Sequence, residues 1–129
     1  MAVRIVRLGS PREQDEGLRI GTVRFPPRGV RKEDLARRDF YDLWLPELAP
    51  SAPLVKLGLA ADTPTRWTVY TRRYRTEMRA PDKIRLLRLL AGLSIAANFS
   101  VGCYCADETR CHRSLLRVLL HDQGAHLAP

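Results

Sequence analysis

The sequence predicts an α/β fold, in which a small central sheet, at least partly parallel, is flanked by helices within a single domain. The apolar patterning runs strand, strand, helices, strand, helix, and such an order packs helices onto a sheet. The last strand is a short apolar run leading towards a helix, as is common for buried parallel strands. At 129 residues, 45% hydrophobic and 28% charged, the chain has the size and composition of one globular domain. We assign residues 1–123 to this domain and residues 124–129 to a short C-terminal tail.

Two strands and one helix are predicted in the first half of the chain. Residues 3–8 alternate in polarity as a strand does, and residues 18–25 form a second strand that Pro26-Pro27 ends. Residues 32–45 have the pattern of one helix or of two short helical pieces, with Phe40, Leu43 and Trp44 on the apolar side, and Pro46 ends it. A proline-rich loop over 46–53 follows.

The second half predicts two helices, a strand and a final helix. Thr63-Pro64 supplies a capping hydroxyl and a proline at the first helical position. Trp67, Tyr70, Tyr74 and Met78 then share one helix face, which we interpret as core packing, with base stacking beside the neighbouring arginines as the alternative. The remaining elements are a largely buried helix from Pro81, an interior parallel strand over 99–104, and a helix from Arg110 to Gln123 that Gly124 closes.

Composition narrows the environment and the partners. No apolar run reaches the ~18–20 residues of a membrane span, and the N-terminus alternates like a strand rather than a signal peptide. We therefore expect a cytoplasmic protein with reduced thiols and no membrane partner. The net charge is +8, and only three of the 22 basic residues are lysines. Arginine suits phosphate and carboxylate, so an anionic small molecule or nucleic acid is the expected partner, against the alternative of solvated surface charge. The oligomeric state stays open.

The segment Gly102–Arg113 concentrates the reactive side chains, because it holds all three cysteines and one histidine. Alternation along a strand places Cys103 and Cys105 on one side, with Cys103 in the core. With Thr109 as the helix cap and Asp107 as its competitor, Cys111 and His112 occupy the first turn. Unpaired backbone N–H groups there favour a thiolate or a bound anion, which Arg113 is placed to contact.

Three interpretations of this segment remain. In the first, Cys111 is a nucleophile or redox thiol, Cys105 lines the strand end, and His112 or Asp107 handles protons. In the second, the three cysteines and His112 bind zinc, although adjacent helix residues point ~100° apart and rarely share one metal. In the third, Cys111 packs in the core as a small hydrophobe. We predict no metal site and no cofactor.

The chain also resembles the YeaO-like family of bacterial proteins, which carry a domain of unknown function, DUF488. The resemblance covers most of residues 1–123 and rests on short motifs in the same order and spacing. These motifs are Leu18–Arg24, Pro27-Arg28-Gly29-Val30, Asp42–Leu45, Leu48–Ser51 and Arg73-Tyr74-Arg75. Members of the family are small α/β proteins without an assigned activity.

The C-terminal piece is similar to another branch of the same broad family. There a cysteine and an acid end a strand and Cys-His-Arg opens a helix, a pattern matched here by Cys105, Asp107 and 111–113. Two positions depart from the YeaO pattern: Val23 stands for an acid and Pro26 for a tryptophan. Arg24 and Arg28 match, so the resemblance implies that they face the same crevice as Cys111.

Together these observations predict an anion-binding pocket with a thiol-dependent enzymatic site. The candidate catalytic residues are Cys111, His112, Asp107 and Cys105, and the candidate anion ligands are Arg113, Arg24 and Arg28. The alternative is a non-catalytic module that binds nucleic acid or a phosphorylated ligand. A zinc-stapled or purely structural segment is third, and whether the protein is an enzyme is left open.

Overall fold

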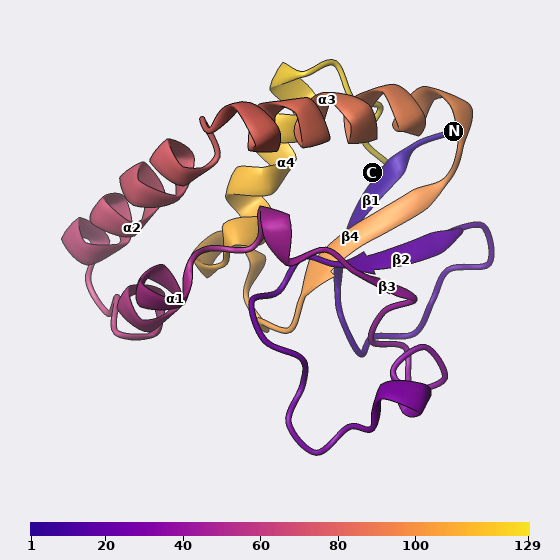
Figure 1. Ribbon diagram of the computed structural model, residues 1–129, viewed down its shortest axis with the longest axis horizontal. Helices are drawn as coiled ribbons and strands as arrows, with labels where there is room; N and C mark the ends of the chain where they lie inside the picture. The colour runs from indigo at the N-terminus through magenta and orange to yellow at the C-terminus, as the bar shows by residue number, and fades with distance from the viewer.

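The computed structural model describes residues 1–129 and confirms the α/β class (Figure 1). Its sheet has four parallel strands in the order β1-β4-β2-β3. The strands are β1 (Val3–Arg7), β2 (Leu18–Gly21), β3 (Leu43–Trp44) and β4 (Phe99–Cys103). The helices are α1 (Ala52–Leu59), α2 (Pro64–Glu77), α3 (Pro81–Ala96) and α4 (His112–Asp122). No helix combines the length and the apolar character that a membrane span requires.

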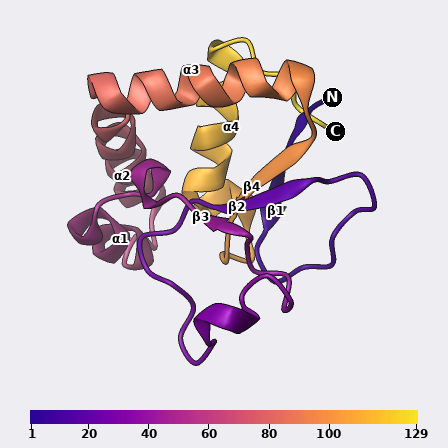
Figure 2. The same cartoon turned by 45° about the vertical axis from the view of Figure 1, so that its right-hand side comes forward.

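One face of the sheet packs against the helices. Val3, Ile20, Phe99 and Val101 project from β1, β2 and β4 into a core shared with α2, α3 and α4. The views in Figures 1 and 2 agree that the four helices gather on one side of the sheet, while the loops after β1 and β2 lie away from them. The helical layer therefore closes over only one face.

The other face is closed by loops through a buried polar network and one aromatic ring. Arg19 of β2 pairs with Glu16, with Nε to Oε2 at 2.7 Å, and the Ser100 hydroxyl of β4 donates to the same oxygen at 2.7 Å. Beside it, Gly21 lies so close to Tyr41 that a Cβ would be 2.4 Å from the ring. Loops can cover this face because strong hydrogen bonds satisfy its buried charges.

The predicted helix over 32–45 is wrong. Only Lys32–Asp34 forms a 3-10 turn, and Asp39 takes a positive φ of 63°, which interrupts any helix. Leu43 and Trp44 then pair with β2 as a short edge strand. The spacing of the apolar residues in this segment resembles a helical face, but the segment is a loop, and its Tyr41 ring packs on Gly21 of β2. The short helix α1 was not predicted.

The predictions for the second half are largely confirmed. Thr63 caps α2 by accepting from the Arg66 N–H, and β4 is an interior parallel strand. The prediction of a largely buried α3 is wrong along one side, where Leu89 is 65% exposed. The last helix begins at His112 with Cys111 as its N-cap, so the prediction of Thr109 as cap is also wrong; Asp107 instead caps the preceding 3-10 turn.

The C-terminal tail is joined to the sheet. Gly124 ends α4 with a φ of 87°, after which the Val3 N–H donates to the His126 carbonyl at 2.8 Å. The Ala128 N–H donates back to the Val3 carbonyl at 2.9 Å, and Ala128 is buried. Residues 124–129 therefore extend the packing of β1.

Candidate functional site

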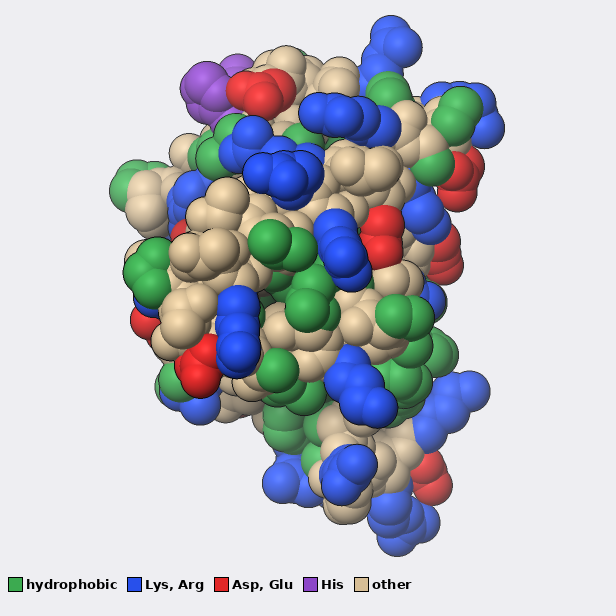
Figure 3. All heavy atoms as spheres, turned by 90° about the vertical axis from the view of Figure 1, so that its left-hand side faces the viewer, with side chains coloured by type: hydrophobic (Ala, Val, Ile, Leu, Met, Phe, Trp, Pro, Cys, Tyr) green, Lys and Arg blue, Asp and Glu red, His purple; other side chains and the backbone are tan.

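A cavity of about 510 Å³ opens where the carboxyl ends of β2 and β4 meet. Neighbouring parallel strands end at the same edge of a sheet, which is where α/β proteins commonly bind ligands. The loop after β2 forms one wall, α1 and α2 form another, and the β4–α4 connection forms the third. The face of the molecule seen in Figure 3 carries apolar side chains among many basic and few acidic ones.

Three thiols lie together at this end of β4. Cys103 is the last residue of the strand and is buried, as the sequence predicted. Cys105 follows on the same side, and its Sγ lies 3.8 Å from that of Cys103. Cys105 is exposed, whereas Cys111 is buried, and all three cysteines are free. The cluster thus presents one accessible sulfur beside two covered ones.

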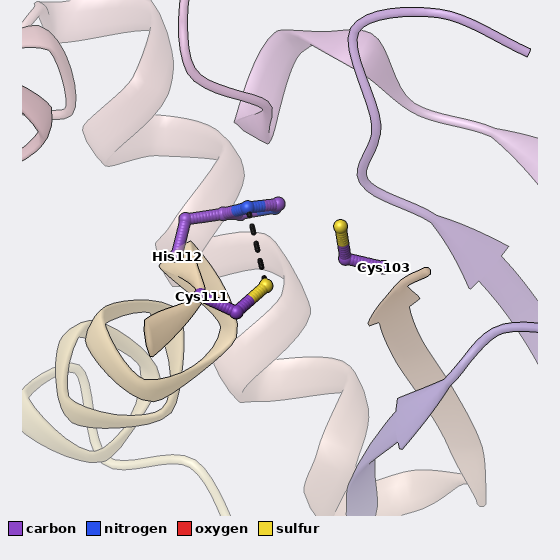
Figure 4. A group of neighbouring side chains, drawn as sticks. All are labelled: Cys103, Cys111 and His112. Atoms are coloured by element: carbon purple, nitrogen blue, oxygen red, sulfur yellow. Dashed lines mark hydrogen bonds between the residues drawn. The ribbon is translucent and has the colours of Figure 1, made fainter. Parts of the chain in front are cut away.

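Cys111 and His112 point toward each other, which corrects the expectation that they diverge. The expectation assumed two adjacent helical residues, but Cys111 is the N-cap and has extended backbone angles, with φ −133° and ψ 151°. Its Sγ therefore lies 3.7 Å from His112 Nδ1, with Cys103 facing the pair from β4 (Figure 4).

The backbone fixes the protonation pattern of His112. Its Nε2 lies 2.7 Å from the carbonyl oxygen of Thr22, at the end of β2. A carbonyl can only accept, so Nε2 carries the proton and donates. In the neutral ring Nδ1 is then an acceptor, directed at the Cys111 thiol. Asp107, the other residue predicted to handle protons, bonds to Thr109 and not to His112.

The other predicted site residues divide into two groups. Arg24 and Arg28 line the cavity with Cys105, Cys111 and His112, whereas Asp107 and Arg113 do not. Arg24 donates to the carbonyls of three residues, which are Pro46, Ala49 and Pro50. The exposed Asp107 accepts from the Thr109 N–H and hydroxyl. Of the predicted anion ligands, only Arg28 presents a cation to the cavity without a partner in the chain.

Arg113 is buried outside the cavity and holds the backbone of the thiol cluster. It is 3% exposed, and its Nη2 donates to the Cys105 carbonyl at 2.5 Å. Its Nε is buried without a partner. The guanidinium therefore holds the Cys105 backbone in place and sets a positive charge near the thiols.

Sequence reasoning missed most of the cavity wall. Arg110 lines the cavity without an ion pair or side-chain hydrogen bond in the chain, and several aromatic rings form the walls. These rings belong to Phe25, Phe40, Trp67, Tyr70 and Tyr104. Gly58 lets Tyr70 approach α1, because a Cβ there would lie 2.6 Å from the ring. Gly58 and the aromatic face of α2 were visible in the sequence. They indicate a cavity wall only once α1 is known to pack against α2.

The pKa values of the Cys103 and Cys105 thiols are shifted in opposite directions. The hydrogen bond from Cys103, together with one from Cys111 and the charge of Arg113, lowers the pKa of Cys105 from 9.0 to about 3 against the cost of burial. The same hydrogen bond with Cys105 raises the pKa of Cys103 well above its ordinary value, with Cys111 and burial adding to it. Cys105 is therefore the thiolate and Cys103 stays protonated.

The same cluster has metal-ligating chemistry. Cys103 Sγ, Cys111 Sγ and His112 Nδ1 all lie within 4.8 Å of one another. Sulfur and imidazole are zinc ligands, and the Nε2 bond to Thr22 is the type of contact that orients a ligating histidine. The residues present could hold a soft or borderline cation.

A comparison with known families identifies the chain. The model described as "DUF488-N3a: Active DUF488-N3 subclade" matches residues 3–124. The chain belongs to the DUF488 family. No curated protein and no solved structure matches it. For this DUF488 protein, the matched region includes the sheet, the cavity and the whole Cys-His-Arg segment, so the resemblance read from the sequence is confirmed.

Proposed function

We propose that this DUF488 protein is a thiol-dependent enzyme in which Cys105 attacks a ligand held in the apolar cavity. The observation that carries the proposal is the position of Cys105, the exposed thiol of a three-cysteine cluster that opens into the cavity. Cys111, the first candidate from the sequence, is 1% exposed, and this burial favours Cys105 over Cys111 as the attacking thiol. The description of the subclade as active supports catalysis.

The surroundings of Cys105 suit a nucleophile. A thiolate attacks far better than a thiol, and neighbouring donors and positive charge favour the thiolate. Cys103 lies at 3.8 Å, and the buried Arg113 is bound to the Cys105 carbonyl. These groups are held by β4 and by the first turn of α4, so the activation is built into the fold.

The covered pair Cys111–His112 supplies the proton that the leaving group needs. The sulfur electron pair of Cys105 forms a bond to an electrophilic carbon, and the leaving group departs with its bonding pair and the Cys111 proton. Water then cleaves the intermediate, which restores the Cys105 thiolate and releases one proton. His112 Nδ1, 3.7 Å from Cys111 Sγ, is placed to pass that proton back to Cys111.

Alkylation mapped by mass spectrometry tests the proposal. In the native protein, iodoacetamide at about pH 6 should modify Cys105 alone, and all three cysteines should react after denaturation. Cys105→Ala should remove the fast reaction, whereas Cys111→Ala should keep it. Slow labelling of all three thiols, or labelling of Cys111 before Cys105, would refute Cys105 as the nucleophile.

A metal-binding function is the second candidate, favoured by the three donors within 4.8 Å. Elemental analysis of protein purified without chelator decides between the two. About one zinc per chain, lost from Cys103→Ala and from Cys111→Ala, would favour the metal. Metal-free protein with rapid Cys105 alkylation would favour the enzyme.

A further inference from the structure

The cavity above the thiols has the chemistry of a nucleotide site. We propose that it takes a nucleotide unit, with the base against the aromatic walls and the phosphate at Arg28 and Arg110. The inference rests on the proposed function in one respect: if Cys105 is the nucleophile, the bound nucleotide is its substrate. The source is either a free nucleoside phosphate or one unit of a single-stranded polynucleotide, and both present the same base and phosphate.

Aromatic side chains on different walls face the cavity. Trp67 and Tyr70 of α2 stack on each other, with ring centroids 4.8 Å apart and an interplanar angle of 15°, and both line the cavity. Across it, Phe25 follows β2 and is 57% exposed. An exposed ring on a hydrogen-bonded loop is a platform for a flat partner, because every base has a face that stacks. The Phe25 backbone is held there by the Tyr104 hydroxyl, which donates to its carbonyl at 3.0 Å.

A polar group inside the cavity is available to the edge of a base. Tyr70 is 4% exposed, and its hydroxyl makes no hydrogen bond within the chain. Burial raises the pKa of Tyr70, so the hydroxyl stays protonated and can donate. The fully buried polar side-chain atom without a partner is Arg113 Nε, so the Tyr70 hydroxyl keeps access to solvent, and a heteroatom of a bound ring would replace water as its partner.

Two free cations define the anionic end of the ligand. Arg28 and Arg110 are exposed, line the cavity from opposite segments of the chain, and have no ion pair or side-chain hydrogen bond. Arg24, by contrast, is occupied by backbone carbonyls. Guanidinium groups bind phosphate in a bidentate manner, so the free pair argues for phosphate and against a neutral apolar ligand.

Tryptophan fluorescence reports binding directly. The chain has two tryptophans, so the Trp44→Phe variant leaves Trp67 in the cavity as the only reporter. AMP, GMP, CMP and UMP are titrated singly, with adenosine as the ring without phosphate and ribose 5-phosphate as the phosphate without a ring. A single-stranded hexanucleotide at low and high salt forms the polynucleotide arm.

We expect at least one nucleoside monophosphate or the hexanucleotide to quench Trp67, and both partial ligands to bind at least tenfold more weakly. Arg28→Ala and Arg110→Ala should each weaken binding about tenfold. Arg75→Ala, on the exposed side of α2 and outside the cavity, is the matched control and should change nothing. Tighter binding of the hexanucleotide that falls steeply with salt identifies the polymer as the source, and a mononucleotide that binds at least as tightly as the hexanucleotide identifies the free nucleotide.

The inference is overturned if no nucleotide quenches Trp67, if adenosine or ribose 5-phosphate binds as tightly as the nucleotides, or if neither arginine variant has an effect. Binding is measured in Cys105→Ala as well, where the proposed attack by Cys105 cannot occur. Nucleotide binding with slow Cys105 alkylation leaves this inference standing and refutes the nucleophile. Fast alkylation without nucleotide binding does the reverse.

Discussion

At the scale of single residues, the position of one carbonyl determines the chemistry of the site. The Thr22 oxygen fixes the proton of His112 on Nε2, which leaves Nδ1 directed at Cys111. The Cys111 thiol is then shared between His112 and Cys105. Because Cys103 also donates to Cys105, the pKa of the exposed Cys105 is lowered and the pKa of the buried Cys103 is raised.

The lowered pKa of Cys105 predicts a pH-independent alkylation rate. With a pKa of about 3, Cys105 is fully a thiolate between about pH 5 and 8, so its reaction with iodoacetamide should be flat over that range. Cys103→Ala removes the largest cause of the shift and should move the midpoint of the rate profile upward, by more than Cys111→Ala does. A wild-type rate that rises tenfold per pH unit up to about pH 8 would contradict this assignment.

At the scale of the elements, the sheet depends on close approaches that only glycine allows. Gly21 of β2 lies under the Tyr41 ring, and a Cβ there would be 2.4 Å from it. The Tyr41 loop cannot retreat freely, because the Asp42 N–H donates to the Arg19 carbonyl at 2.8 Å. This contact joins the loop 35–42 to the strand whose end forms the cavity.

Gly21→Ala is therefore expected to destabilise the protein by roughly 1–3 kcal/mol through overpacking against Tyr41. Gly92→Ala is the matched control. Gly92 lies inside α3 with nothing within 4 Å of an added Cβ, so alanine should stabilise by roughly 0.4–1 kcal/mol. Urea unfolding of both variants measures the change in unfolding free energy, which should be a loss for Gly21→Ala and a gain for Gly92→Ala. Equal effects would show that the Tyr41 contact gives way without cost.

The same scale shows which elements were readable from the sequence. The helix α2 was predicted because its cap, its first proline and its aromatic stripe are local. The strand β3 was not, because two residues become a strand only when β2 lies beside them. For the site, the family resemblance implied that Arg24 and Arg28 face the same crevice as Cys111, and these residues line one cavity with Cys105. The direction of the Arg113 side chain depends on where the Cys105 carbonyl lies, and no local pattern encodes that.

At the scale of the whole molecule, the two faces of the sheet are stabilised by different physics. The helical side buries a hydrophobic core, whereas the loop side buries the ion pair of Glu16 and Arg19. Glu16 is 1% exposed and Arg19 is fully buried. Arg19 also donates to the carbonyls of Ser10 and Asp39 at 2.8 and 2.7 Å, so one side chain joins β2 to both covering loops.

Removing one member of this pair leaves a buried charge alone, so Glu16→Gln should cost roughly 3–5 kcal/mol of unfolding free energy at neutral pH. Burial raises the pKa of Glu16, but the hydrogen bonds from Arg19 and Ser100 outweigh it and the net pKa is lowered. The stabilisation by this carboxylate is therefore complete above its unfolded pKa of about 4.5 and is lost as the pH falls through the folded pKa. Urea unfolding between about pH 3 and 7 should show the gap between wild type and Glu16→Gln narrowing toward acid. The double variant Glu16→Gln with Arg19→Met removes both charges and should recover part of the loss, and a gap that stays constant with pH would exclude ionised Glu16 as the source of the stabilisation.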